Sequence, residues 1–443
     1  MKKLCLFFIT CSLVLNLGCT KDFLDERPAK SLLVPSTLTD LQALLDNINV
    51  MNSAPALPTV VADDYSLLEG GALKIDAVQS GGYFWADDAY QGNTVGDWNT
   101  PYQQIFYSNV VLDALAKIEI NPATQNTYNA IKGSAYFYKA MALHNLLQLF
   151  AKPYDEHADS YPGLPVPLSS DVNERPARQT LSYSYAQLLK NLQDAIALLP
   201  LKPVTKNRPS QQAVLALMAR VYLIMQDYPQ AEAYAEKALN ISRSLIDYNT
   251  AVATTTPFGQ VLPNGIDEVI FYNKKLSYAF FTSGIIKIDA GLASLYHSND
   301  LRRKFYFRDG TNSSVSFTGY EGLTTDELYL ISAECKARRN NIEGAMNELN
   351  TLLQKRWKTG TYVNQSAGTA SLALSLILTE RRKELVGRGL RWTDLRRLNQ
   401  DPKLAITLTR TYGGKTYTLP PNDKKYTFPI PDREIQYGII EQN

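Results

Sequence analysis

The sequence predicts an all-α fold, in which a scaffold of paired helices carries irregular, loop-rich insertions. Apolar residues recur at spacings of three and four in several separated blocks, which is the helical period. Between these blocks lie segments with no helical period, at about 51–97, 247–322 and 400–443. With 45% hydrophobic residues the chain can fill a large core, and we expect a single domain over residues 19–443.

The N-terminus has the layout of a cleaved lipoprotein signal over residues 1–18. Lys2 and Lys3 precede an uncharged run that ends at Gly18, and Cys19 follows. The run is too short for a transmembrane helix, which needs about 20 apolar residues. We therefore expect Cys19 to be acylated and to anchor the mature chain to a membrane, with simple secretion as the alternative.

Charge and cysteine usage exclude two classes of protein. The whole chain has 45 basic and 43 acidic residues, and the signal removes two lysines and no acid, which leaves a neutral mature chain. Nucleic-acid binding needs clustered positive charge, so no nucleic-acid partner is expected. Once the signal and an acylated Cys19 are set aside, Cys335 has no partner for an intrachain disulfide.

Three helices are predicted before the middle of the chain. The first runs from about residue 98 to Lys117, the second from about Gln125 to Phe150, and the third from Leu181 to Leu199, before Pro200. One face of the first helix carries four residues at i, i+4, i+7 and i+11, which are Trp98, Tyr102, Ile105 and Asn109.

Residues 210–241 match the tetratricopeptide pattern of two antiparallel helices. Small residues let the two helices approach closely, and Tyr222 is expected to fill the space opposite them. A weaker copy spans about 326–357, where Ala333 and Ala345 repeat the twelve-residue spacing of Ala219 and Ala231. The tetratricopeptide-like helices are therefore placed at about 98–241 and 323–399.

Four passages resemble the SusD/RagB family of Bacteroidetes outer-membrane lipoproteins over nearly the whole chain. They are Cys19 to Asp25 with Pro28; the pattern Trp98, Tyr102, Ile105 and Asn109; Glu380 to Leu385 with Gly389, Arg391, Trp392 and Asp394 to Arg397; and Phe428 to Pro431 with Arg433 to Ile435. In the third passage, the spacings of Glu384 with Arg388 and of Asp394 with Arg397 predict local ion pairs.

The resemblance implies a non-catalytic protein on the extracellular side of the outer membrane. Members of the family bind glycan, or peptide in the RagB branch, and sit on a SusC-like TonB-dependent barrel. No cofactor is implied.

The chemistry of one loop is compatible with glycan binding. Sugar rings pack on aromatic side chains while carboxylates and amides bond to hydroxyls, and Tyr83, Trp85, Asp87 and Tyr90 supply both kinds of group. Because this segment has no helical period to bury its rings, we expect some of them to face solvent, with Trp85 as the best platform. Further ligand-binding candidates are Trp98, Tyr278 and Phe281.

Two other functions remain open alternatives, a glycoside hydrolase and a pure tetratricopeptide interaction scaffold. A glycosidase needs two carboxylates at a set separation, and nothing in the sequence singles out such a pair. The adjacent acids Asp63–Asp64 and Asp87–Asp88 are expected to be solvated loop residues. No spacing of histidine, cysteine and aspartate suggests a zinc site, whereas a calcium ion bound by a loop stays an open alternative. No catalytic residue is assigned.

Overall fold

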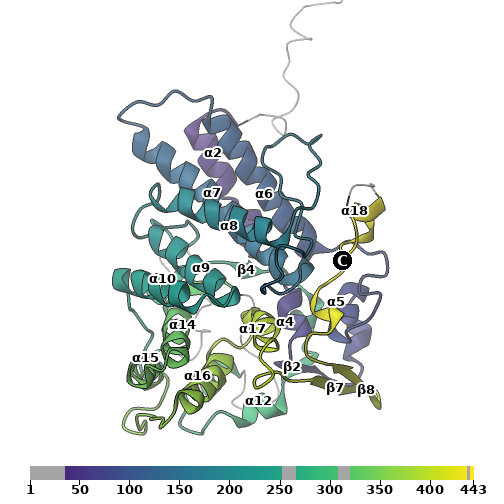
Figure 1. Ribbon diagram of the computed structural model, residues 1–443, viewed down its shortest axis with the longest axis vertical. Coiled ribbons are helices and arrows are strands. Elements are labelled where there is room, and N and C mark those ends of the chain that lie inside the picture. Colours follow the sequence, from purple (N-terminus) through teal and green to yellow (C-terminus); the bar gives the residue numbers. More distant parts are fainter. Residues whose placement is uncertain (1–34, 252–265, 308–319, 437–439) are drawn as a thin grey trace, which may run out of the picture. The chain divides into compact units, whose positions relative to one another are not determined.

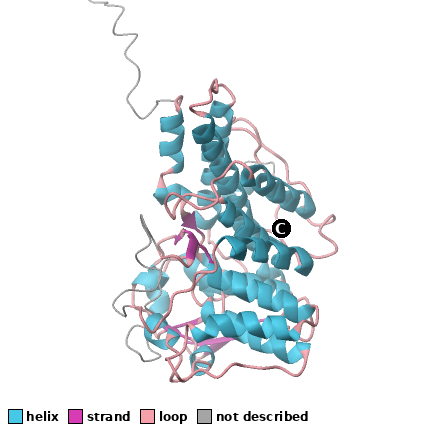
Figure 2. Ribbon diagram, turned by 90° about the vertical axis from the view of Figure 1, so that its left-hand side faces the viewer, coloured by secondary structure: helices cyan, strands magenta, loops and turns pink. Residues whose placement is uncertain are grey.

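The computed structural model describes residues 35–251, 266–307, 320–436 and 440–443 (Figure 1). The chain divides into two compact units, Met1–Ser36 and Thr37–Asn443, and the second contains every described element. The predicted signal peptide and Cys19 lie outside the described residues. Helices dominate the second unit, and its strands are short (Figure 2).

A first group of helices forms from the N-terminal half. Helices α6 (Gly96–Leu115), α7 (Gln125–Phe150) and α8 (Leu181–Ile196) pack side by side in chain order, and α2 (Leu38–Leu45) packs against α6 and α7 (Figure 1). Thr37 caps α2 and Thr180 caps α8, each through a side-chain oxygen that accepts a main-chain N–H. The three helices predicted from the sequence are therefore confirmed, with α8 ending slightly before Pro200.

The amide of Asn109 explains why the first-helix pattern needs an asparagine. Its Nδ2 donates to the carbonyls of Pro167 and Ser169, at 3.2 and 2.8 Å, and its Oδ1 accepts from Lys139 on α7 at 2.7 Å. One buried amide thus joins two helices and the loop that follows them.

The tetratricopeptide pattern is confirmed in both copies. Helices α9 (Gln211–Ile224) and α10 (Tyr228–Ile241) form the first pair, and α14 (Thr325–Arg338) and α15 (Ile342–Gln354) form the second. The alanines of the pattern, Ala219, Ala231, Ala333 and Ala345, are all fully buried. Tyr222 is only half-buried, and its ring stacks on Tyr234 at 5.3 Å.

A buried ion pair connects the two repeats. Arg220 on α9 donates to both carboxylate oxygens of Glu327 on α14, at 2.9 and 2.6 Å, and both side chains are almost fully buried. Helices α16 (Ala370–Glu384) and α17 (Leu390–Leu398) follow the second repeat, and α16 packs on α14 and α15.

The loop-rich segments carry the remaining short elements. Four two-stranded pairs link distant parts of the chain: β1 (Ser53–Ala54) with β4 (Lys274–Lys275) in parallel, and three antiparallel pairs, β2 (Tyr65–Leu67) with β5 (Ile286–Ile288), β3 (Val269–Phe271) with β6 (Leu323–Thr324) and β7 (Leu408–Tyr412) with β8 (Lys415–Leu419). The short helices are α3 (Ile48–Met51), α4 (Leu57–Val61), η3 (Gly71–Lys74), α5 (Ala77–Tyr83), α11 (Ala279–Thr282), α12 (Ala290–Ser294), α13 (Arg302–Tyr306), η4 (Lys424–Tyr426) and α18 (Asp432–Gln436).

Within the described residues, no helix has both the length and the apolar character that a membrane crossing requires.

Candidate functional site

A cleft of about 1120 Å³ lies where five segments from distant parts of the chain meet. It is large enough for an extended ligand, since small-molecule sites have volumes of about 300–1,000 Å³. Its lining comes from residues 81–89 after the start of α5, 152–162 after α7, 225–226 after α9, 396–400 at the end of α17, and 422–429, together with Asn443. We call this feature the cleft.

Two half-buried tyrosines give the cleft aromatic surface. Tyr161 donates to the carboxylate of Asp155 at 3.2 Å, and the Lys152 ammonium lies 4.2 Å from its ring centroid. Tyr154 packs edge-on against Tyr185, at 4.8 Å between centroids. Neither residue was among the sequence candidates. The sequence did contain a signal for these two tyrosines. Directly after the longest predicted helix, Lys-Pro-Tyr and Tyr-Pro flank a loop that holds four charged or titratable residues.

Backbone strain gathers around the cleft. Trp85, Gln226 and Asn422 line it and have φ values of 51°, 62° and 58°. Left-handed backbone is a true outlier for a bulky residue such as tryptophan, and such strain occurs preferentially at functional sites.

Three of the four rings in this segment are buried, which corrects the expectation that they face solvent, and the fourth, Phe84, is half-buried. Tyr83, Trp85 and Tyr90 are only 2%, 5% and 3% exposed. Each also uses its polar atom inside the protein: the Tyr83 hydroxyl accepts from the Leu67 N–H at 2.9 Å, and the Tyr90 hydroxyl donates to the Pro429 carbonyl at 2.7 Å. The sequence could not reveal this burial in full, because the partners of the rings include residues more than 300 positions away, namely Arg410 beside Tyr83 and Trp85 and Pro429 bonded to Tyr90.

Arg410 on β7 contacts two of these rings. Its guanidinium lies 4.0 Å from the ring centroid of Tyr83 and 4.4 Å from that of Trp85. It also donates to the main-chain carbonyls of Tyr83 and Val61. Of the two stacked residues, only Trp85 lines the cleft.

The other sequence candidates are scattered. Trp98 is 3% exposed and packs edge-on against Phe150. Tyr278 is half-buried and donates to the carboxylate of Asp97. Phe281 is half-buried, with the Lys275 ammonium 4.6 Å from its ring centroid. None of the three lines the cleft, so their part in ligand binding stays a prediction.

The two pairs of adjacent acids have different environments. Asp87 is exposed, lines the cleft and forms an ion pair with Lys425 at 3.0 Å. Asp64 is buried and Asp63 is half-buried, contrary to the expectation that both are solvated: Arg391 binds Asp63 at 2.7 and 3.0 Å, and Arg382 contacts both. Burial opposes charge on Asp63, but Arg391 and Arg382 lower its pKa to about 2, whereas burial raises the pKa of Asp64 to about 6.

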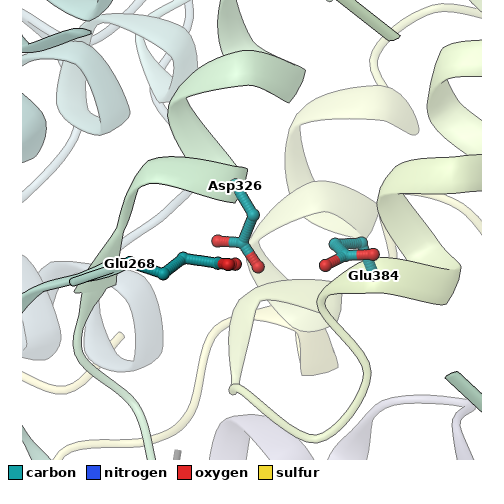
Figure 3. A group of neighbouring side chains, drawn as sticks. All are labelled: Glu268, Asp326 and Glu384. Carbon is teal, nitrogen blue, oxygen red and sulfur yellow. The ribbon is translucent and has the colours of Figure 1, made fainter. Parts of the chain in front are cut away.

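A buried cluster of three carboxylates lies apart from the cleft, formed by Glu268, Asp326 and Glu384 (Figure 3). Their ligand oxygens lie within 4.8 Å of one another, and among the described residues this is the one group with the spacing of a metal site. Arginine guanidinia already occupy the space that a cation would take. Arg356 donates to Glu268 and Glu384 at 2.6 and 2.7 Å.

Two further arginines complete the neutralisation of this cluster. Arg388 donates to Asp326 at 2.7 Å, and Arg302 donates to Glu384 at 3.0 Å. Burial raises the pKa of Glu268 to about 8; burial also opposes charge on Asp326, but Arg388 holds its pKa well below its usual range. The donor set fits a structural ion-pair network and not a metal centre.

The same network explains the passage from Glu380 to Arg397, the third of the four passages that resemble the SusD/RagB family. Glu384 accepts from Arg302 and Arg356, while Arg388 donates to Asp326 and Thr324, so these partners replace the predicted pairing of Glu384 with Arg388. The reason is local: α16 ends at Glu384, and Gly387 has a φ of 73°, so the chain turns before Arg388. The predicted pair of Asp394 with Arg397 is confirmed at 2.9 Å.

Comparison with known proteins agrees with this architecture. A family model described as "Starch-binding associating with outer membrane" matches residues 22–223, and one described as "SusD family" matches residues 303–438. Comparison with curated proteins finds no match.

Solved structures share the fold over nearly their whole length. A SusD superfamily protein from Bacteroides thetaiotaomicron has 24% identity and a TM-score of 0.75, covering 92% of this chain and 99% of the other. A putative sugar binding protein from Bacteroides vulgatus has 20% identity and a TM-score of 0.74, covering 93% and 99%. A surface glycan-binding protein A from Bacteroides fluxus has 17% identity and a TM-score of 0.66, covering 94% and 99%.

At these identities the structures establish the fold, which is that of a SusD-like helical protein. The two family models span most of the sequence between them, and the chain belongs to the SusD/RagB family.

Proposed function

We propose that this protein is a non-catalytic surface lipoprotein that captures glycan and delivers it to a SusC-like TonB-dependent transporter in the outer membrane. The observation that carries the proposal is the cleft, which combines two half-buried tyrosines with charged and amide side chains in a volume of about 1120 Å³. Rings that pack on sugar C–H faces and polar groups that bond to hydroxyls are both required for carbohydrate recognition.

The match to a family model is a second, separate support for this proposal. One of the matching models is described as starch-binding and as associating with the outer membrane. Anchoring through an acylated Cys19 would hold the chain at that membrane, and a SusC-like barrel would receive the ligand.

The ligand site can be tested with calorimetry on the purified mature chain. Oligosaccharides and peptides are titrated in parallel, and we expect glycan binding without release of reducing ends. Stacking on one aromatic ring contributes about 0.5–1.5 kcal/mol, so Tyr161→Ala should weaken binding about twofold to tenfold.

Tyr107→Ala is the matched control, because Tyr107 is also half-buried but lies on α6 outside the cleft. Equal losses in the two variants would mean that the cleft does not bind the ligand. Binding of peptide and not of glycan would favour the RagB-type function, and release of reducing ends would show a hydrolase.

Delivery to the transporter is tested separately. A SusC-like barrel encoded beside this gene should copurify with the tagged lipoprotein, and its absence from the purified fraction would contradict the proposed partnership.

A further inference from the structure

The C-terminal residues 441–443 bind to one side of the cleft through two side-chain amides. Gln442 pairs with the main chain of Ile430 in both directions: its Oε1 accepts from the Ile430 N–H at 2.7 Å, and its Nε2 donates to the Ile430 carbonyl at 2.9 Å. Asn443 lines the cleft, and its Nδ2 donates to the carbonyl of Phe428 at 2.6 Å. Phe428 belongs to the lining segment 422–429, which we call the C-terminal wall.

The same asparagine also binds to the opposite side of the cleft. There, residues 152–162 form the lining segment that carries the two half-buried tyrosines, and we call this segment the tyrosine wall. The Nδ2 of Asn443 donates to the carbonyl of Phe150, two residues before the tyrosine wall, at 3.0 Å. Its Oδ1 accepts from Arg178 at 2.7 Å. One exposed amide therefore contacts both sides of the cleft.

Arg178 binds the far end of the tyrosine wall. Its Nε donates to the carbonyl of Gly163 at 2.8 Å, and its Nη2 donates to the carbonyl of Pro162 at 3.3 Å. Its Nη1 donates to the carbonyl of Glu441 at 2.7 Å. The guanidinium thus joins the end of the tyrosine wall to residues 441–443. We call Arg178 and residues 441–443 the bridge.

The bridge acts at a different place from the other contacts between the walls. The N–H of Phe428 donates to the carbonyl of Leu149 at 2.8 Å, just before the tyrosine wall begins. The end of that wall bonds to residues on its own side, where the Leu181 N–H donates to the carbonyl of Tyr161 at 2.8 Å. Among the hydrogen bonds and ion pairs of the described residues, only the bridge joins this end to the C-terminal wall.

The bridge is also exposed to water, unlike the bonds of the helical scaffold. All three residues of 441–443 are exposed, and Arg178 is half-buried. Exposed hydrogen bonds exchange readily with water, and segments that they hold open locally at a small cost in free energy. The bridge can therefore control the separation of the two walls without controlling the stability of the whole fold.

Resting on the proposed glycan-binding function, we propose that Arg178 and Asn443 are positioning residues of the cleft. The bridge fixes the separation of the tyrosine wall and the C-terminal wall, so a glycan that contacts both walls finds them already in place. Walls that are fixed before binding lower the entropy cost of ordering the site around its ligand.

The separation of the walls can be measured without any ligand. Glu156 and Lys424 are exposed and line the cleft on opposite walls, so Glu156→Cys and Lys424→Cys together place one nitroxide spin label on each wall. The labels are attached to the mature chain with Cys19→Ser, in which the remaining cysteine, Cys335, is buried. Double electron–electron resonance on this reference protein should give one narrow distribution of distances.

Two variants of the reference protein break the bridge. Asn443→Asp keeps the acceptor for Arg178 but loses the amide donor to Phe150 and Phe428. Arg178→Lys keeps the charge, but an ammonium cannot reproduce the planar fork that donates to four acceptors. Each variant should shift the distribution to longer and broader distances. The thermal midpoint should stay near that of the reference, because surface substitutions change stability little.

Asn364→Asp and Arg339→Lys are the matched controls. Asn364 is an exposed asparagine that accepts a hydrogen bond from Gln354, and Arg339 is an exposed arginine that pairs with Glu232. Neither residue lines the cleft. Both controls should leave the distribution of distances unchanged.

The outcomes separate this inference from the proposed function. Unchanged distances in either bridge variant overturn the inference and leave glycan binding open to its own test. Broader distances that come with a clear fall in the thermal midpoint also overturn it, because the two residues would then hold the fold as a whole. Broader distances at an unchanged midpoint support the bridge, and since the measurement uses no sugar, failed glycan titrations would count against the proposed function alone.

Discussion

The indole Nε1 of Trp85 donates a hydrogen bond to the main-chain carbonyl of Val61 at 3.1 Å. This bond fixes a tryptophan whose backbone is left-handed and whose ring centroid lies 4.4 Å from the Arg410 guanidinium. The residue that the sequence nominated as a sugar platform is therefore buried and held by contacts inside the protein, and its part in ligand binding stays a prediction.

Trp85→Ala should destabilise the protein by about 3–5 kcal/mol, as expected for deleting a buried aromatic ring. Chemical denaturation measures the loss. Trp85→Phe keeps a ring but loses the bond to Val61, and should cost about 1–2 kcal/mol. An unchanged unfolding midpoint in Trp85→Ala would mean that the ring is dispensable for the fold.

Removing the central arginine of the buried network should be costly. Arg356→Met leaves Glu268 and Glu384 without their shared partner, and breaking a buried ion pair typically destabilises by about 3–5 kcal/mol. Lys190→Met provides the comparison, because the exposed pair of Lys190 with Asp194 should contribute less than about 1 kcal/mol. Similar melting temperatures for the two variants would contradict the role assigned to the network.

The local pattern of the sequence was sufficient to predict the helical scaffold and insufficient to predict the cleft. The bounds of α7 follow from its apolar spacing, and the two repeats follow from Ala219, Ala231, Ala333 and Ala345, because helical period and residue size are local properties. The cleft is formed by segments that lie far apart in the sequence, and local patterns do not show which of these segments meet. Nothing near Trp85 reveals that Arg410 covers it, and nothing near Asn399 reveals Tyr426 beside it.

His144 should make the protein sensitive to mild acid. Burial lowers its pKa from 6.5 to about 3, with a smaller contribution from Arg220. Between these two values the unfolded chain binds a proton that the folded chain does not, so this group's contribution to stability falls as the pH drops from about 6.5 to about 3. The slope is at most about 1.4 kcal/mol per pH unit.

The measurement for His144 is the difference between two stability curves. His144→Leu should lose less stability than wild type between pH 6.5 and 4.5, which separates His144 from Glu268, whose raised pKa acts in the opposite direction. Parallel curves would show that His144 is protonated in the folded protein.

The close approach of α9 and α10 can be tested by overpacking. Ala219 is fully buried, and Ala219→Trp should destabilise by about 1–3 kcal/mol or more because a large ring cannot fit between the helices. Ala233 is exposed on α10, so Ala233→Trp should leave the thermal midpoint nearly unchanged. If both variants melt like wild type, Ala219 does not face a partner helix.

Anchoring through Cys19 predicts that radiolabelled palmitate enters the wild-type protein in cells and does not enter Cys19→Ala. Total lipoprotein labelling in the same cells is the control. Label that persists in the variant would exclude this anchor.

The ion pair of Arg220 with Glu327 restricts how this architecture can change. Tandem helical repeats usually tolerate duplication or excision of a unit, because each unit contacts only its neighbours through similar apolar surfaces. Here the interface between two units holds one buried cation and one buried anion. A unit inserted between them would leave each charge facing apolar surface, at a desolvation cost of several kcal/mol per ion. The two units are therefore not interchangeable, and the length of the array is fixed by charge as well as by shape.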